Sequence, residues 1–236
     1  MFKKSILVFT LLTSFNSAAA VITAIAEPGT ATTLSYTADT GAFQSTNFTD
    51  QFLFPQFDDL SGTLTLTNVK IDLTASVNGV VGVENKDVTA QNVYYNLAAT
   101  VKLLLGVDTL VTSLPTVNGT FAASAYDGVD DKAGTSGITY SDLSGGPVSE
   151  NINYTTSLSA YIGTGNISTD LQANAGSFGN GPGNLSQEFA TNAKALATIT
   201  YTFENSVIQV SEPSSLAILG ASLLAFGLIR RRTNRV

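Results

Sequence analysis

The stretch that decides the fold is Thr63–Val77, which reads TLTLTNVKIDLTASV. Leu64 and Leu66 alternate with threonine and therefore share one face of an extended chain. The same alternation continues in the opposite phase through five apolar residues, namely Val69, Ile71, Leu73, Ala75 and Val77. Because side chains on a strand alternate with a period of two, the change of phase at Thr67-Asn68 predicts a β-bulge or a break between two strands.

The same pattern recurs on both sides of this stretch. Asn78-Gly79 predicts a hairpin turn, after which Val81 and Val83 resume the alternation. Further strands are predicted from apolar positions 93–105, 117–125, 152–162 and 195–203. Many strands without a long amphipathic helix predict an all-β fold over residues 27–209, a β-sandwich of Greek-key or jelly-roll type. A closed barrel is the alternative.

Two stretches are predicted to be long loops. Asp127–Pro147 is polar, and Gly163–Asn184 is rich in glycine and asparagine. Loops of this length often carry function, so both are candidate places for a site.

The first 26 residues are typical of a secretory signal peptide. Lys3 and Lys4 precede the apolar run Ser5–Phe15, and small residues follow. Cleavage is predicted after Ala20 or Ala26. The body of the protein is then expected to be extracytoplasmic.

The other end of the chain predicts a membrane helix. Leu216–Ile229 contains no charged residue, and with two preceding serines it forms a predicted helix over residues 214–229. Arg230, Arg231 and Arg232 follow at once and begin a basic tail. The positive-inside rule would hold these arginines at the cytoplasmic side as a membrane stop.

The order of these C-terminal features resembles a PEP-CTERM sorting segment. Ser211-Glu212-Pro213, the apolar helix and the arginine cluster follow one another within residues 210–236. The first proline of the usual Pro-Glu-Pro motif is replaced here by Ser211. The resemblance implies recognition by exosortase, a membrane-embedded processing enzyme of Gram-negative bacteria. It also implies cleavage near the motif and transfer from the inner membrane to the cell surface or the extracellular matrix of a biofilm.

The body resembles the choice-of-anchor E domain. The resemblance rests on Phe54-Pro55-Gln56-Phe57-Asp58, on Leu64–Leu73, on Val83-Glu84-Asn85 and on the closing run Ile199–Phe203. It covers about residues 30–205 and implies a surface protein, without any catalytic residue to carry over.

Composition excludes several kinds of chemistry. The 236-residue chain has no histidine and no cysteine, so a Ser-His-Asp triad, a thiol nucleophile and an imidazole or thiolate metal site are all excluded. The net charge is −7, and residues 21–211 hold 17 acidic residues against five lysines, a net charge of −12. So acidic a body is expected to repel nucleic acid.

Oxygen ligands leave one cofactor to consider. Asp127, Asp130 and Asp131 lie close together in sequence and are candidate ligands for Ca²⁺, with a solvated turn as the alternative. No other cofactor is expected.

Five phenylalanines between positions 43 and 57 are expected in the core, with a sugar-stacking surface as the alternative. Asp58-Asp59 and Glu84-Asn85 are expected at turns.

These features predict a non-enzymatic exported protein of the cell surface or extracellular matrix. Its expected partners are exosortase, the membrane and, as a candidate, extracellular polysaccharide. A carbohydrate- or calcium-binding surface module is the alternative. A hydrolase that uses two carboxylates ranks last, because no motif supports it.

Overall fold

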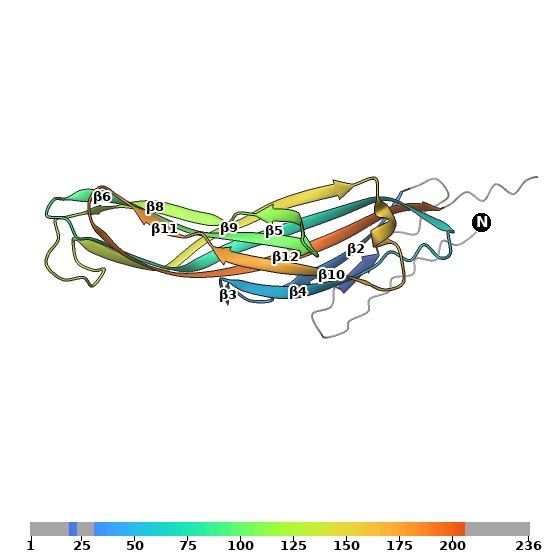
Figure 1. Cartoon of the computed structure of the whole chain (residues 1–236), viewed down its shortest axis with the longest axis horizontal. Coiled ribbons are helices and arrows are strands. Elements are labelled where there is room, and N and C mark those ends of the chain that lie inside the picture. Colours follow the sequence, from blue (N-terminus) through green and yellow to red (C-terminus); the bar gives the residue numbers. More distant parts are fainter. Residues whose placement is uncertain (1–18, 23–30, 206–236) are drawn as a thin grey trace, which may run out of the picture. The chain divides into compact units, whose positions relative to one another are not determined.

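The computed structural model describes residues 19–22 and 31–205, which form twelve strands and one short 3₁₀ helix (Figure 1). They belong to one unit of the chain, Met1–Asn205, whereas residues 206–236 belong to a second unit and are not described. The described residues form two six-stranded sheets, and every strand pairing within them is antiparallel. The body is therefore all-β, as predicted, with the two layers of a β-sandwich.

The first sheet is built around two long neighbouring strands, β5 (Leu64–Asn85) and β12 (Leu185–Asn205). Its order is β1-β2-β12-β5-β9, and β3 also pairs with β12. The remaining members are β1 (Ala19–Ile22), β2 (Thr32–Asp39), β3 (Gln44–Ser45) and β9 (Gly137–Tyr154).

The second sheet is centred on β6 (Gln91–Leu105). One edge of β6 pairs with β7 (Asp108–Ser113) and β8 (Thr116–Ala123), and the other edge pairs with β10 (Asn166–Ala175) and β11 (Phe178–Asn180). β4 (Phe48–Pro55) lies beyond β10. The 3₁₀ helix η1 (Leu158–Tyr161) follows β9.

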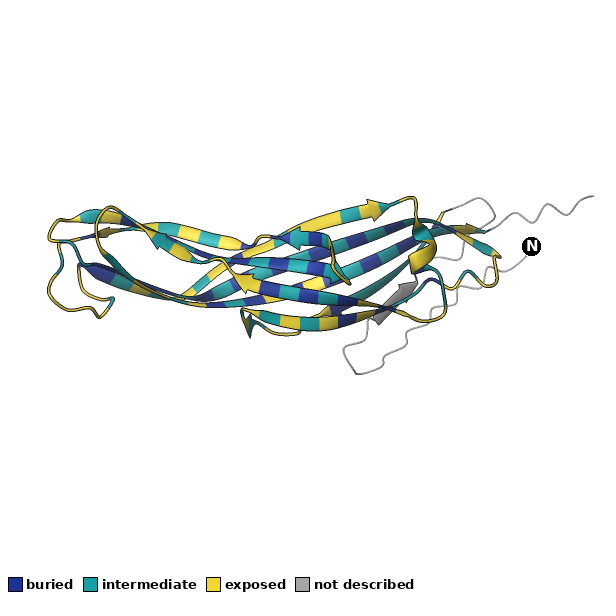
Figure 2. Ribbon diagram, in the orientation of Figure 1, coloured by how far each residue is buried: buried dark blue, intermediate teal, exposed yellow. Residues whose placement is uncertain are grey.

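The core lies between the sheets and is filled by alternate residues of the long strands, which Figure 2 shows as buried bands along each ribbon. The five apolar residues of the odd phase in Thr63–Val77 are all buried, as are Val81 and Val83. Facing them on β6 are Val93, Tyr95, Leu97, Ala99, Val101 and Leu103. Burying one face of each sheet fixes the pairing register, because a slip of one residue would turn the whole apolar set outward.

The predicted irregularity at Thr67-Asn68 is a β-bulge within one strand. Thr202 pairs with Asn68 and Phe203 pairs with Leu66, so Thr67 is the extra residue. Its hydroxyl donates to the Thr202 carbonyl oxygen at 3.0 Å. The bulge explains how both apolar phases of the sequence lie in a single strand: Leu66 and Val69 are both buried.

The predicted hairpin turn at Asn78-Gly79 is wrong, because β5 continues straight through both residues to Asn85. Gly79 is required there for another reason: a Cβ at this position would collide with the Ala190 carbonyl oxygen of β12. Close approach of two backbones, rather than a turn, thus accounts for this glycine.

Both predicted loops are wrong in part. Residues 137–147 of the first belong to β9, and most of the second forms β10 and β11. β10 lies between β4 and β6, with Ile167, Leu171 and Ala173 in the core. Glycine and asparagine flank this strand, whereas its own inward positions alternate as those of a half-buried strand do.

Three smaller expectations have clear outcomes. The strand predicted over 152–162 ends at Tyr154 and is followed by η1. Of the five phenylalanines, Phe52, Phe54 and Phe57 are fully buried. The Asp58 carboxylate accepts a hydrogen bond from the Leu60 backbone N–H at 2.9 Å, which confirms the predicted turn at Asp58-Asp59.

Candidate functional site

The predicted sorting residues lie outside the described part of the chain. This holds for Ser211, Glu212 and Pro213, for the helix predicted over 214–229, and for the arginines at 230–232. Within residues 19–22 and 31–205, no helix has the length and apolar character needed to cross a membrane. Of the predicted signal peptide, only β1 is described; it pairs with β2 through positions such as Ala19 opposite Thr37.

The predicted metal ligands lie in the segment that joins β8 to β9, residues 124–136, which we call the acidic loop. This loop lies over the outer face of the first sheet where β5 and β12 come to one end of the body. The carbon atoms of Lys132 lie against Gly82 of β5, where a Cβ would come within 3.2 Å of Cγ. The Tyr126 N–H donates to the Asp87 carbonyl oxygen at 2.8 Å, and the Ser124 N–H donates to Thr135 at the same distance. The loop is thus tied both to itself and to the end of the sheet.

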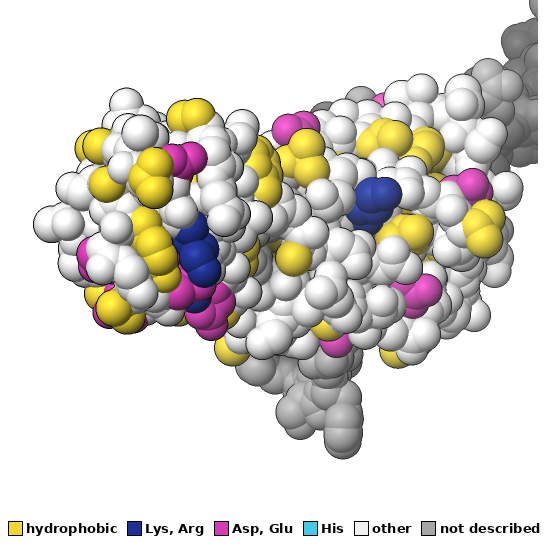
Figure 3. All heavy atoms as spheres, turned by 60° about the vertical axis from the view of Figure 1, so that its left-hand side comes forward, with side chains coloured by type: hydrophobic (Ala, Val, Ile, Leu, Met, Phe, Trp, Pro, Cys, Tyr) yellow, Lys and Arg dark blue, Asp and Glu magenta, His cyan; other side chains and the backbone are white. Residues whose placement is uncertain are grey.

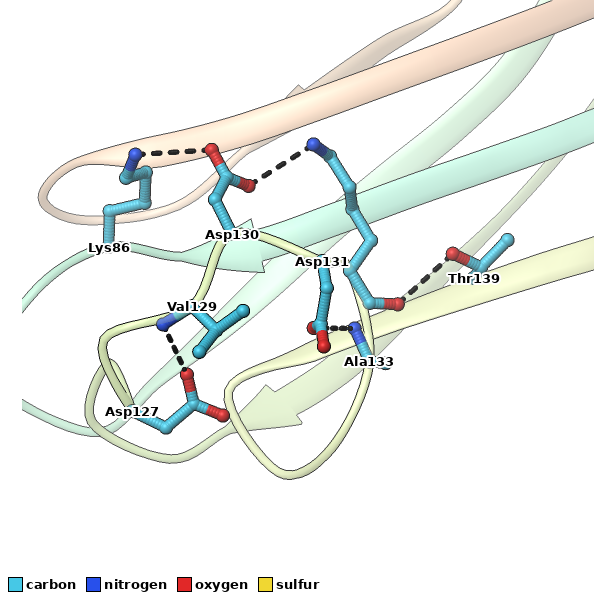
Figure 4. Close-up of polar contacts among 8 residues, drawn as sticks. Lys86, Asp127, Val129, Asp130, Asp131, Ala133 and Thr139 are labelled. Carbon is cyan, nitrogen blue, oxygen red and sulfur yellow. Dashed lines mark hydrogen bonds and ion pairs between the residues drawn. The ribbon is translucent and has the colours of Figure 1, made fainter.

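Asp130 is the centre of the charged contacts of the acidic loop (Figure 4). One of its carboxylate oxygens lies 3.1 Å from Lys86 Nζ, and the other lies 3.1 Å from Lys132 Nζ. Hydrogen bonds from Lys86, from Lys132 and from Ser186 lower the pKa of Asp130 to about 2. The hydrogen bond between Lys86 and Asp130 also raises the pKa of Lys86. Figure 3 shows basic side chains directly against acidic ones at this end of the body.

The carboxylates of Asp127 and Asp131 instead accept hydrogen bonds from backbone groups two residues further along the chain. Asp127 Oδ1 accepts the Val129 N–H at 2.9 Å, and Asp131 Oδ1 accepts the Ala133 N–H at 3.0 Å (Figure 4). Such contacts from Asp to the backbone two residues on are typical of Asx turns. The described residues contain no group of three or more acidic side chains that could hold a metal ion. The three candidate aspartates therefore share a loop without forming a common ligand set.

A buried carboxyl group lies beside the acidic loop. Glu84 is on the outward phase of β5, yet it is fully buried, and neither carboxyl oxygen has a hydrogen-bond partner. A Cβ at Gly137, its register partner on β9, would collide with Glu84 Oε2. The neighbouring lysine ammonium groups are bound to Asp130. The Ala133 backbone N of the acidic loop lies close to the same point at Gly137, so the loop helps to cover this carboxyl group.

Asn85 closes the same end of the body from the inner side. Its amide nitrogen donates to the carbonyl oxygens of Thr89 at 2.8 Å and Ser124 at 2.7 Å. Its amide oxygen accepts the Asp87 N–H at 2.9 Å. The turn predicted at Glu84-Asn85 therefore begins at Asn85, whereas Glu84 lies within β5 and pairs with both neighbouring strands. The asparagine thus joins β5 to the chain on both sides of the acidic loop.

Sequence reasoning missed Lys86, Lys132 and Glu84 as members of one charged cluster. The available indication was scarcity: the body has only five lysines, and one of them, Lys132, directly follows Asp131 in the sequence. The distance along the chain between Lys86 and Asp130 gives no hint of the pairing, which depends on how the loop folds back over the sheet.

Comparison with known proteins adds no family. No family model matches the chain, and no curated protein matches it. Among solved structures, two of infectious bursal disease virus are similar over much of this chain. The Gx strain structure has 9% identity, a TM-score of 0.19 and coverage of 86% of this chain and 42% of that chain. The Gt strain structure has 13% identity, a TM-score of 0.12 and coverage of 92% of this chain and 56% of that chain. The chain thus spans about half the length of these proteins.

Proposed function

We propose that this protein is a non-enzymatic, exported component of the cell surface or extracellular matrix of a Gram-negative bacterium, sorted by exosortase. The observation that carries the proposal is the order of features in residues 210–236: motif, apolar segment and arginine cluster. The predicted signal peptide at the opposite end supports export, because both ends then direct the chain to the membrane. The acidic β-rich body is what would be delivered.

For the body we propose a jelly-roll type of sandwich. In one sheet β12 lies between β2 and β5, with β9 beyond β5; in the other, β10 lies between β4 and β6, with β7 and β8 beyond β6. Pairing of early strands with late ones in both layers is what two Greek keys wound together require. A body of this kind depends on packing and backbone pairing alone, since the chain has no cysteine.

The experiment that tests this function is intact mass measurement and C-terminal peptide mapping of the protein from its native host, fraction by fraction. The expected mature chain ends near Ser211–Pro213 and is found on the outer surface or in the medium. A chain that keeps Arg230–Arg235 and stays in the inner membrane would overturn the proposal and leave a simple tail-anchored domain.

Variants make this test sharper. Pro213→Ala is expected to leave unprocessed chain in the membrane, whereas Glu204→Ala, an exposed substitution in β12, should be processed normally. Ser211→Pro restores the usual motif and should raise the processed fraction. Equal processing of all four proteins, including wild type, would show that the motif is not read.

A further inference from the structure

The outer face of the first sheet is hollowed along β5 and β12, between β9 on one side and residues 39–41 on the other. Two hollows, of about 350 and 220 Å³, lie next to each other on this face. Their floors follow one another along outward residues of β5 and β12 that face one another in register. These are Thr74, Ser76, Lys194 and Leu196 in the larger hollow and Asn78 and Asn192 in the smaller one. We call this surface the polar trough.

The walls of the polar trough come from irregular backbone. On one side, β9 departs from regular pairing with β5 twice, between Ala75 and Val77 and between Gly79 and Val81. The residues that bulge out there include Pro147 at the larger hollow and Asp142 at the smaller one. The other wall consists of Asp39, the last residue of β2, and of Thr40 and Gly41, which follow that strand. Bulges at an edge strand are features that shape a surface rather than defects of pairing.

Hydrogen-bonding groups of the trough remain unused by the protein. In the described part of the chain, the hydroxyls of Ser76, Ser141 and Ser144 have no partner in the structure. Asn78 Oδ1 accepts from Asn192 Nδ2 at 3.3 Å, which leaves the Asn78 amide N–H groups free. The floor therefore offers several donors and acceptors at fixed positions along one row.

The trough is lined by two aspartates, Asp39 and Asp142, and by one lysine, Lys194, whereas the body as a whole is strongly acidic. Three lysines of the body are paired with aspartate, at Lys70–Asp72, Lys86–Asp130 and Lys132–Asp130. Lys194 has no carboxylate partner among the described residues, and its Nζ lies 4.7 Å from the centre of the Phe43 ring. Its ammonium group therefore contacts a ring rather than a carboxylate, and its N–H donors are unbonded within the described structure at the floor of the larger hollow.

We propose that the polar trough binds a neutral polysaccharide chain. Hydroxyl and amide side chains both donate and accept, as sugar hydroxyls do, and the Lys194 ammonium adds strong donors. Residues 74–78 extend for about 13 Å along β5, which gives a linear ligand room to lie across both hollows. Apolar side chains also line the hollows, among them Leu196 and Pro147 in the larger one and Leu143 in the smaller one. They lie between polar groups and can contact the C–H faces of sugar rings. This inference takes from the proposed function only the location of the body, outside the cell.

The test is native affinity electrophoresis of the purified full chain in gels that contain dextran, hydroxyethyl cellulose, β-1,3-glucan, galactomannan or alginate. Retardation is expected with at least one of the four neutral polymers. Ser76→Phe, which fills the floor, should abolish it, and Lys194→Ala should raise the apparent Kd about tenfold through loss of a charged hydrogen-bond donor.

Thr198→Phe is the matched control, because it adds the same ring on the outward face of β12 outside both hollows. It should bind like wild type, and thermal melting of each variant checks that the body is folded. Retardation by none of the neutral polymers, retardation by alginate alone, or binding unaffected by Ser76→Phe would each overturn the proposal. Because this assay does not depend on processing, its failure is distinguishable from a failure of exosortase sorting.

Discussion

The hydroxyl of Tyr201 donates a hydrogen bond to the Pro55 carbonyl oxygen at 2.9 Å and so joins the last strand of one sheet to β4 of the other. Tyr201 is fully buried, with the rings of Tyr36 and Phe57 at 6.1 and 5.9 Å between centroids. This burial raises the pKa of Tyr201, and burial likewise raises the pKa of Tyr161 to about 12. The contact ties the two layers together where the chain enters the turn at Asp58-Asp59.

Replacing Tyr201 with phenylalanine tests this link. Tyr201→Phe should lower the free energy of unfolding by about 1–2 kcal/mol, because it removes the bond and leaves the Pro55 carbonyl oxygen unpaired. Urea denaturation at pH 7 measures the change. Tyr94→Phe is the control, since the Tyr94 hydroxyl has no hydrogen bond in the described structure, and it should stay within about 0.5 kcal/mol of wild type.

The same variant predicts a pH dependence. A phenol whose pKa is raised by folding contributes stability that is present below the unfolded pKa, near 10, and is lost as pH rises above it. The difference between wild type and Tyr201→Phe should therefore shrink above pH 10. A constant difference from pH 7 to pH 11 would contradict the assignment of this group to the buried interface.

Strand β10 provides a second test, because its place in the core was not predicted. Leu171 is fully buried between β4 and β6, so Leu171→Ala should cost about 2–5 kcal/mol through lost burial and the cavity left behind. Leu114→Ala is the matched control, because Leu114 is 59% exposed. Equal unfolding midpoints for the two variants in urea would show that β10 is not part of the core.

The sequence predicted the fold class from alternation but not the length of its elements. The run Thr63–Val77 was enough to indicate extended chain, its buried face and a bulge or break at Thr67-Asn68, because these depend on local side-chain order. The hairpin turn at Asn78-Gly79 was predicted wrongly because glycine is required both in such a turn and where two backbones approach closely. The pairing of Gly79 with Thr191 distinguishes the close approach from the turn, and this pairing depends on residues that are distant in the sequence.

The charged cluster and the polar trough are harder to predict for the same physical reason. Asn192 reaches Asn78, and Lys86 reaches Asp130, only once the register of whole strands is set. The aspartates clustered in sequence were candidate Ca²⁺ ligands, whereas in the folded loop Asp130 contacts two lysines and Asp127 and Asp131 accept backbone N–H groups. Local spacing shows which groups are near one another along the chain, and it does not show where each side chain points.

Replacing Glu84 with an apolar residue is expected to stabilise the protein. Its carboxyl oxygens are buried without partners, so Glu84→Met should raise the free energy of unfolding by about 1–3 kcal/mol. Thermal and urea denaturation measure this, with Glu150→Met at an exposed position of β9 as the control. A large loss of stability instead would mean that Glu84 has a partner in solution, such as a bound cation. Repeating the melts with added Ca²⁺ or Na⁺ would identify it.

Asp130 gives the last prediction, because its two lysine contacts hold the acidic loop over the sheet. Asp130→Asn should loosen the loop at pH 7, seen as faster amide hydrogen exchange in residues 124–136. Since folding lowers the pKa of Asp130 to about 2, its stabilising effect is present above the unfolded pKa of 3.8 and is lost as pH falls from there toward 2. The difference in loop protection between wild type and Asp130→Asn should accordingly be full at pH 7 and much smaller at pH 2.5.

Asp127→Asn, which leaves both lysine contacts of Asp130 in place, is the control for the loss of a carboxylate in the same loop. If that control loosens the loop as much as Asp130→Asn does, the turns rather than the ion pairs hold it in place.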